Sequence, residues 1–157
     1  MAAVASNTSG LQEWEHATPL DGERWKTRLR QELAALIKLI KQDKGKGQGW
    51  FTLRPENEQG IEWKGTCMTW HKDVKHEFEL VVVLPATYPA SPPEISLPQL
   101  KEKSEKLYRG GHICLDIHFT PAWHQRKGAG GIAFALVQGL APWLASEVPL
   151  MVERGLL

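Results

Sequence analysis

Residues 61–84 read IEWKGTCMTWHKDVKHEFELVVVL, and apolar and polar residues alternate through much of this stretch. A period of two is typical of β-strands, whose successive side chains point to opposite faces. It predicts strands at residues 61–71 and 76–84, joined by a turn at residues 71–73. A shorter strand at residues 50–54 precedes them, so the three form an antiparallel meander. Cys67 falls on the second strand, where we interpret it as a small core residue.

A helix is predicted upstream of the sheet, at residues 21–43. Its apolar residues recur at spacings of three and four, which is typical of one face of an amphipathic helix. They are Trp25, Leu29, Leu33, Leu36, Ile37 and Ile40. Charged residues fill much of the remaining surface, and Asp21 is placed to act as the N-cap. Residues 1–20 are mostly small or polar and show no period, so we predict a flexible tail there.

Downstream of the sheet, the chain is predicted to cross in a semi-extended form. Five prolines between residues 85 and 98 exclude a helix there, although residues 94–97 can still form a short edge strand. Residues 99–129 show almost no period and are predicted to form a long loop, which in a compact domain is usually functional. An apolar helix at residues 132–140 is interrupted at Pro142, and a second short helix follows at residues 143–148. This order predicts a single α+β domain over residues 21–157.

The composition argues against several classes of protein. The formal net charge is +1, with 19 basic and 18 acidic residues, whereas a dedicated nucleic-acid binder is markedly basic. The longest apolar run, residues 80–86, is far shorter than the ~20 residues of a membrane span. The N-terminal residues do not have the pattern of a signal peptide. We therefore expect a soluble intracellular protein in which Cys114 is a free thiol.

The long loop contains the second cysteine. Residues 104–124 read SEKLYRGGHICLDIHFTPAWH, with Cys114 between two apolar residues. As a thiolate, Cys114 would be a nucleophile that forms a reactive thioester. With His112, His118 and either His124 or Cys67 it would instead be a zinc ligand, although zinc sites normally show paired ligands. The third interpretation is an inert buried thiol, and the residues alone leave all three open.

Two phrases in this region resemble the ubiquitin-conjugating enzyme family. They are YPASPPEISLP at residues 88–98 and GGHICLDIHFTPAW at residues 110–123, and the likeness extends over residues 24–148. That family has an N-terminal helix, a four-stranded meander, a Tyr-Pro…Pro-Pro crossing, a catalytic cysteine in a long loop and a downstream helix. The resemblance therefore implies an α+β fold of the ubiquitin-conjugating-enzyme (UBC-like) type, with short C-terminal helices.

One departure from the common members of the family indicates a particular branch. Those members carry His-Pro-Asn upstream of the cysteine, with the asparagine eight residues before it, whereas this chain has Lys106 at that position. The branch that conjugates the ubiquitin-fold modifier carries Thr-Ala-Lys there, and here Ser104 and Glu105 precede the lysine. The phrases YRGG at residues 108–111 and GLAPWLASEVP at residues 139–149 are also similar to that branch.

The resemblance implies a transferase. Cys114 would accept the C-terminal glycyl group of the modifier as a thioester from an activating enzyme, and a substrate lysine would then receive it with the help of a ligase. Lys106 would stabilise the oxyanion or the thiolate. Supporting roles around the loop are implied for Ser104, Tyr108, Arg109, Asp116 and His118. No metal or small cofactor is implied, since the activating enzyme consumes the nucleotide.

The implied partners are the ubiquitin-fold modifier, its activating enzyme, its ligase complex and substrate proteins, with no nucleic acid and no direct insertion into a membrane. The N-terminal helix would bind the activating enzyme and the ligase through the basic residues Arg24, Arg28 and Lys38. The implied location is the cytoplasm, with the nucleus, or the ER surface through the ligase, as further sites. The alternatives are a non-catalytic RWD-type binding module of related fold, whose members lack the cysteine, and a zinc-dependent or cysteine hydrolase.

Overall fold

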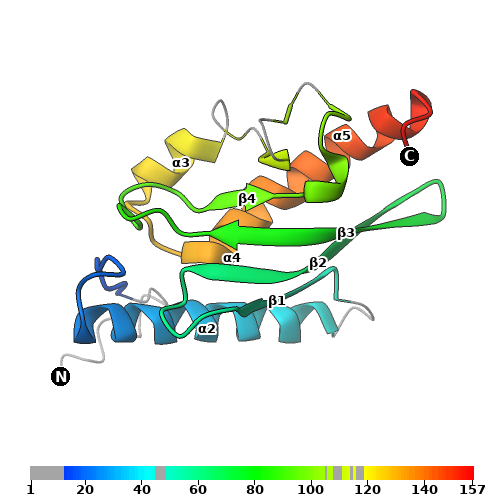
Figure 1. Cartoon of the computed structure of the whole chain (residues 1–157). Helices are drawn as coiled ribbons and strands as arrows, with labels where there is room; N and C mark the ends of the chain where they lie inside the picture. The colour runs from blue at the N-terminus through cyan, green and yellow to red at the C-terminus, as the bar shows by residue number, and fades with distance from the viewer. Residues whose placement is uncertain (1–12, 45–48, 105, 108–110, 114, 116–118) are drawn as a thin grey trace.

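The computed structural model describes residues 13–44, 49–104, 106–107, 111–113, 115 and 119–157. Its centre is a four-stranded antiparallel sheet in the order β1-β2-β3-β4. Figure 1 shows α2 running along one side of the sheet and the C-terminal helices passing behind it. The elements are α2 (Glu23–Lys44), β1 (Phe51–Pro55), β2 (Glu62–His71), β3 (Val74–Val83), β4 (Glu94–Ser96), η1 (Pro98–Leu100), α3 (Phe119–Gln125), α4 (Gly131–Ala135), η3 (Leu136–Leu140) and α5 (Ala141–Glu153). The predicted α+β layout, with an N-terminal helix and a four-stranded meander, is confirmed.

The sheet follows the period-two pattern of the sequence. β2 and β3 pair along their whole length and are joined by a two-residue turn. Both turn residues, Lys72 and Asp73, have positive φ angles, which is the type I′ geometry that matches the twist of a hairpin. The β3 positions predicted to share one face are buried, namely Phe78, Leu80 and Val82.

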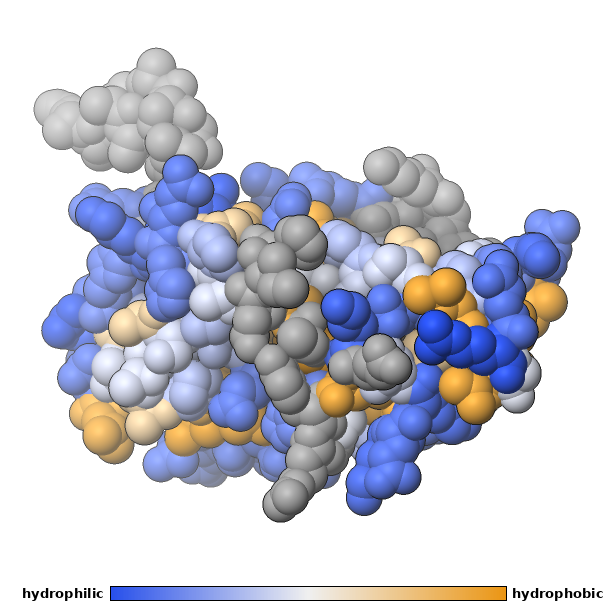
Figure 2. Space-filling view, turned by 90° about the horizontal axis from the view of Figure 1, so that it is seen from above, coloured by the Kyte–Doolittle hydropathy of each residue, from blue (hydrophilic) through white to orange (hydrophobic). Residues whose placement is uncertain are grey.

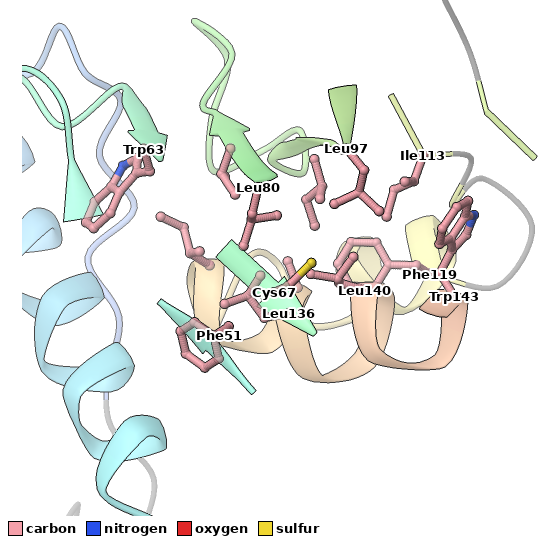
Figure 3. Packing of buried hydrophobic residues seen from close by; sticks show 14 of the residues in the cluster. Phe51, Trp63, Cys67, Leu80, Leu97, Ile113, Phe119, Leu136, Leu140 and Trp143 are labelled. Carbon is pink, nitrogen blue, oxygen red and sulfur yellow. The ribbon is translucent and has the colours of Figure 1, made fainter. Parts of the chain in front are cut away.

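The hydrophobic core lies between the sheet and the C-terminal helices. Figure 3 shows Cys67 of β2 and Leu80 of β3 in one cluster with Leu136 and Leu140 of η3. Cys67 is 1% exposed, so its interpretation as a core residue is confirmed. Ile113, Phe119 and Trp143 lie at one end of the same cluster (Figure 3), which connects the core to the cysteine loop.

The helix α2 lies close to its predicted bounds, but its buried face differs from the prediction. Along the helix the buried positions are Trp25, Arg28, Glu32 and Leu36. Ile37, which was assigned to the apolar face, is 52% exposed. The buried side of α2 therefore includes two charged residues that the sequence pattern placed on the solvent side.

These two charges form an ion pair inside the protein. Arg28 Nε donates to Glu32 Oε2 at 2.8 Å, one helical turn away, and neither side chain is exposed. Arg28 Nη2 donates to the Gly128 carbonyl at 2.8 Å, and Glu32 Oε1 accepts from the Ile132 N–H at 2.8 Å. The Tyr88 hydroxyl accepts from Arg28 and donates to Glu32. Tyr88, Gly128 and Ile132 thus help to satisfy the two buried charges, which also bond to each other.

Arg28 is therefore not a docking residue, and the predicted partner-binding role for it is wrong. Its guanidinium lies 4.7 Å from the ring of Trp14, and its Nη1 donates to the Glu15 carbonyl at 3.1 Å. With the side chain 0% exposed, no partner protein can reach it. The physical reason is that its hydrogen bonds are made inside the domain.

The segment before α2 packs onto that helix. The Gln31 side chain donates to the Glu13 carbonyl and accepts from the Glu15 N–H, and Ala17 is fully buried. The predicted tail boundary at residue 20 therefore does not hold for residues 13–17, while residues 1–12 lie outside the described residues. Asp21, predicted as the N-cap, accepts a hydrogen bond from the Thr18 N–H instead. That bond lowers the pKa of the Asp21 carboxyl.

The C-terminal helices form one continuous helical segment, so the predicted interruption at Pro142 is wrong. Pro142 lies in the first turn of α5, directly after the π-helical segment η3. The helix can continue through this residue because the proline ring fixes φ near a helical value, and only its own N–H is missing from the hydrogen bonds of the helix. The segment Gly131–Glu153 is long and apolar enough to cross a membrane by length and composition, but half of its most apolar window is buried inside the protein. That burial is typical of a core helix.

Candidate active site around the cysteine loop

The chain directly before Cys114 is held by pairing with neighbouring segments. Leu97 N–H donates to the Gly111 carbonyl at 2.8 Å, and Ile113 N–H donates to the Ile95 carbonyl at 3.0 Å. These bonds extend the sheet beyond β4 by the short run 111–113. Cys114 itself, like Tyr108, Arg109, Asp116 and His118, lies outside the described residues. The predicted roles of these five residues therefore remain predictions.

A second pairing connects the run before Cys114 to the segment that carries Lys106. Leu107 and Ile113 form an antiparallel bridge. Lys106 directly precedes Leu107 in the sequence, and Cys114 directly follows Ile113. The structure therefore brings together the immediate chain neighbours of the two residues to which the sequence assigned the chemistry. The Lys106 side chain is exposed.

The backbone of Lys106 is bonded on both sides. Its N–H donates to Ser104 Oγ at 3.0 Å, and its carbonyl accepts from Trp143 Nε1 at 3.3 Å. Ser104 Oγ in turn donates to Glu147 Oε1 at 2.7 Å. Ser104 thus has a structural role next to Lys106, while Glu147 and Trp143 come from α5.

A pocket of about 340 Å³ lies beside the cysteine loop. Ile113 and Leu115, the two chain neighbours of Cys114, both line it. The other lining residues are Pro92, Pro93, Glu94, Ile95, His112, Phe119 and Thr120. Figure 2 shows the molecule from above, with hydrophilic residues over much of the surface and hydrophobic ones in separate small areas.

The other cysteine is unsuited to chemistry. Burial raises the pKa of the Cys67 thiol to about 12, and the negative charge of Glu77 adds to this rise. At neutral pH the thiol is therefore protonated and shielded from solvent, unlike a reactive cysteine. Among the described residues, no group of three His, Cys, Asp or Glu side chains is placed to hold a metal ion. His118 and Cys114 of the zinc interpretation are not among them.

Of the predicted docking residues, Arg24 and Lys38 lie on the surface of α2. Arg24 is 58% exposed and pairs with Glu15 at 3.2 Å. Lys38 lines a groove of about 430 Å³ between α2 and the α4–η3 segment, with Arg126 at the same groove. The exposed face of α2 therefore keeps two of the three predicted basic residues.

Sequence reasoning missed several residues of this region. The helix α3 was assigned to a loop, although Phe119 and Trp123 have the spacing of one helical turn and are both buried. Glu147 and Trp143 fall within the phrase GLAPWLASEVP, but their contacts with Ser104 and Lys106 join segments about 40 residues apart. His112 Nδ1 lies 3.1 Å from Ser96 Oγ. Only a pairing of distant segments could have identified these contacts.

Comparison with known proteins gives one consistent result at the level of sequence. The family model described as Ubiquitin-fold modifier-conjugating enzyme 1 matches residues 10–157. The chain is 44% identical to Ubiquitin-fold modifier-conjugating enzyme 1 of Arabidopsis thaliana over 88% of this chain and 80% of that protein. It is 46% identical to the protein of the same name in Oryza sativa subsp. japonica, over 89% and 76%. It is 45% identical to the Drosophila sechellia protein of that name, over 90% of this chain and 85% of that protein.

Solved structures give a looser match. The Plasmodium vivax ubiquitin conjugating enzyme E2 aligns with a TM-score of 0.48 and 18% identity, over 76% of this chain and 97% of that one. The ubiquitin conjugating enzyme E2 from Plasmodium falciparum aligns with a TM-score of 0.45 and 19% identity, over 67% and 75%. These alignments are too loose to bear on activity.

Proposed function

Because the chain belongs to the ubiquitin-fold modifier-conjugating enzyme family and is thus a conjugating enzyme of ufmylation, we propose that Cys114 carries the modifier as a thioester. The observation that carries the proposal is the bridge between Leu107 and Ile113, which pairs the chain neighbours of Lys106 and Cys114. From this pairing we expect the ammonium group of Lys106, which stands eight residues before Cys114 in the sequence, to lie near the thiol. Cys67, the other cysteine, is buried and protonated.

The chemistry consists of two acyl transfers. In the first, the Cys114 thiolate attacks the thioester carbonyl between the modifier's C-terminal glycyl group and a cysteine of the activating enzyme. A new C–S bond forms, the old C–S bond breaks, and the activating enzyme's cysteine leaves as a thiolate. In the second, the neutral amine of a substrate lysine attacks the same carbonyl carbon. A C–N bond forms, the amine loses a proton, and Cys114 leaves as a thiolate.

Both transfers pass through a tetrahedral oxyanion, and we assign its stabilisation to Lys106. A positive charge placed where negative charge develops stabilises the transition state more than the ground state. The side chain of Lys106 is exposed, so an incoming thioester can reach it. Its backbone is hydrogen-bonded at both the N–H and the carbonyl, which limits the positions of the ammonium group.

Replacing Lys106 with alanine should slow discharge of the charged protein onto free lysine by about 100-fold, the loss typical of a removed oxyanion donor. The measurement is a single-turnover assay that starts from purified thioester, so that the charging rate does not enter. Lys106→Arg, which keeps the charge, should retain more activity than Lys106→Ala. The matched control is Lys101→Ala, an exposed lysine after η1, which should discharge at the normal rate. Normal discharge by Lys106→Ala would remove the proposed role.

We further propose that the exposed face of α2 binds the activating enzyme and the ligase. Arg24 and Lys38 supply positive charge there, and Lys38 borders the groove between α2 and the α4–η3 segment. Ile37, 52% exposed on the same helix, adds apolar surface to it. A basic and partly apolar helix face suits a partner segment that carries acidic and apolar side chains.

Reversing the charge of Lys38 with Lys38→Glu should slow transfer of the modifier from the activating enzyme by about fivefold at low salt, because steering by opposite charges is lost. The difference should shrink as salt is raised, since screening weakens interactions between exposed charges. Lys75→Glu is the matched control, because Lys75 is also exposed but lies on β3. Equal transfer rates for both variants would argue against docking on α2.

The location follows from the same proposal. We place the protein in the cytoplasm, with further sites in the nucleus and, through its ligase, at the ER surface. Loss of the ER-associated fraction in cells that lack the ligase would be the expected result. A fraction that stays with the membrane after the ligase is removed would contradict this placement.

A further inference from the structure

The side chain of Glu147 on α5 fixes the orientation of the Ser104 hydroxyl. A carboxylate oxygen only accepts hydrogen bonds, so the 2.7 Å contact requires Ser104 Oγ to donate its proton to Glu147 Oε1. The lone pairs of Ser104 Oγ are then available for the N–H of Lys106, which lies 3.0 Å away. The direction of both bonds is therefore determined by the carboxylate. Without it, the hydroxyl would rotate freely between competing partners.

A second residue of the same helix bonds the other side of Lys106. Trp143 Nε1 donates to the Lys106 carbonyl at 3.3 Å. Trp143 and Glu147 are four residues apart, so they lie on one face of α5, one turn from each other. The N–H of Lys106 is thus linked to α5 through Ser104 and Glu147, and its carbonyl is linked to the same helix through Trp143. Two such restraints fix the position of the intervening Cα far better than one.

The helix that supplies these bonds is itself firmly packed. Leu144, Val148 and Met151 of α5 are buried in the core. The restraint therefore runs from the core to Lys106 through side chains of fixed position. Since a displacement of about 1 Å at a catalytic group can cost 100-fold in rate, such a restraint matters for an oxyanion contact.

We propose that Glu147 is a positioning residue for the conjugation reaction, which through Ser104 holds Lys106 at the place where it meets the oxyanion. The inference rests on the proposed role of Lys106 and goes beyond it by naming the residue that sets the geometry. Glu147 touches neither the modifier nor the acceptor amine in this scheme. Its removal should therefore lower the limiting discharge rate and leave unchanged the free-lysine concentration that gives half of that rate.

The test is single-turnover discharge onto free lysine, followed as a function of lysine concentration. Glu147→Ala and Ser104→Ala should each lower the limiting rate by about tenfold, because both remove one of the two hydrogen-bonded links between Lys106 and α5. Ser104→Thr keeps the hydroxyl and should restore the rate to within about twofold of the original, since threonine supplies the same donor and acceptor. Glu153→Ala, which removes an exposed glutamate from the end of the same helix, is the matched control. Thermal unfolding of every variant separates a loss of position from a loss of fold.

A double substitution decides whether Glu147 acts through Lys106. In a Lys106→Ala background, Glu147→Ala should have no further effect on discharge, because residues acting through one another are not additive. An undiminished tenfold loss in that background would overturn the inference while leaving the role of Lys106 intact. A normal rate for both Glu147→Ala and Ser104→Ala, with Lys106→Ala slow, would overturn it as well. Normal discharge by Lys106→Ala would instead remove the proposed role of Lys106, on which the inference rests, and would leave the thioester on Cys114 untouched.

Discussion

Replacing Cys114 with alanine should abolish thioester formation with the ubiquitin-fold modifier. The thiolate is the nucleophile in the proposed transfer, and alanine offers none. Cys114→Ser should trap the modifier as an oxyester, because a hydroxyl forms an ester that free thiols do not readily cleave. The readout is a gel of the charged protein with and without reductant. The wild-type adduct should disappear with reductant, the serine adduct should persist, and the alanine variant should show neither.

The chain contains its own control for this experiment. Cys67 is retained in every variant, and its pKa of about 12 means that it is almost entirely protonated at neutral pH. A reductant-sensitive adduct on Cys114→Ala would place the nucleophile elsewhere and contradict the proposal. Charging with ubiquitin and its own activating enzyme should fail in parallel. If a thioester formed with ubiquitin but not with the ubiquitin-fold modifier, Cys114 would still be the nucleophile, but the proposal that it carries the ubiquitin-fold modifier would be wrong.

Replacing Arg28 with alanine should destabilise the fold by about 3–5 kcal/mol, the cost of breaking a buried ion pair and leaving one charge uncompensated. The Glu32 carboxylate would lose its partner, and the Gly128 carbonyl would lose its donor. In a domain of this size such a loss lowers the melting temperature by about 10 °C. Urea denaturation followed by tryptophan fluorescence measures the free energy of unfolding directly.

Arg24→Ala is the matched control for Arg28→Ala. Arg24 pairs with Glu15 at the surface, where an ion pair contributes about 1 kcal/mol or less. The double variant Arg28→Met, Glu32→Met should recover part of the loss, since replacing both charges with apolar groups avoids an unpaired buried charge. A free energy of unfolding for Arg28→Ala equal to that of Arg24→Ala would contradict the buried role. It would also reopen Arg28 as a contact for partner proteins.

The sheet could be predicted from the sequence because each strand is marked by the alternation of its own consecutive residues. The alternation around Cys67 and Leu80 has a period of two, and the structure buries those positions. The buried face of α2 was predicted less accurately than the sheet, since Arg28 and Glu32 are charged and a hydropathy pattern places them in solvent. Their burial becomes favourable through partners elsewhere in the chain, and two of these, at residues 128 and 132, lie 100 residues away.

The cysteine loop shows the same division. The phrase around Cys114 identified the family, because the order of residue types there is specific to its chemistry. The role of Lys106 followed from the resemblance, because this lysine stands eight residues before the cysteine, where common members of the family have asparagine. The role of Glu147 could not be predicted, since a glutamate on a helix is usually solvated and its contact with Ser104 joins positions 43 residues apart. The continuity of α5 with η3 was missed because a proline in a first turn looks the same in sequence as one that ends a helix.

The ion pair of Arg28 and Glu32 also bears on how the chain folds during synthesis. These charges emerge from the ribosome 100 residues before the Gly128 carbonyl and the Ile132 N–H that they bind. Until then α2 has two charges on the side that must be buried, and burying them without these partners is unfavourable. The N-terminal helix therefore cannot dock in its final position ahead of the C-terminal third. The domain should complete its folding in one late cooperative step, after the whole chain has been made.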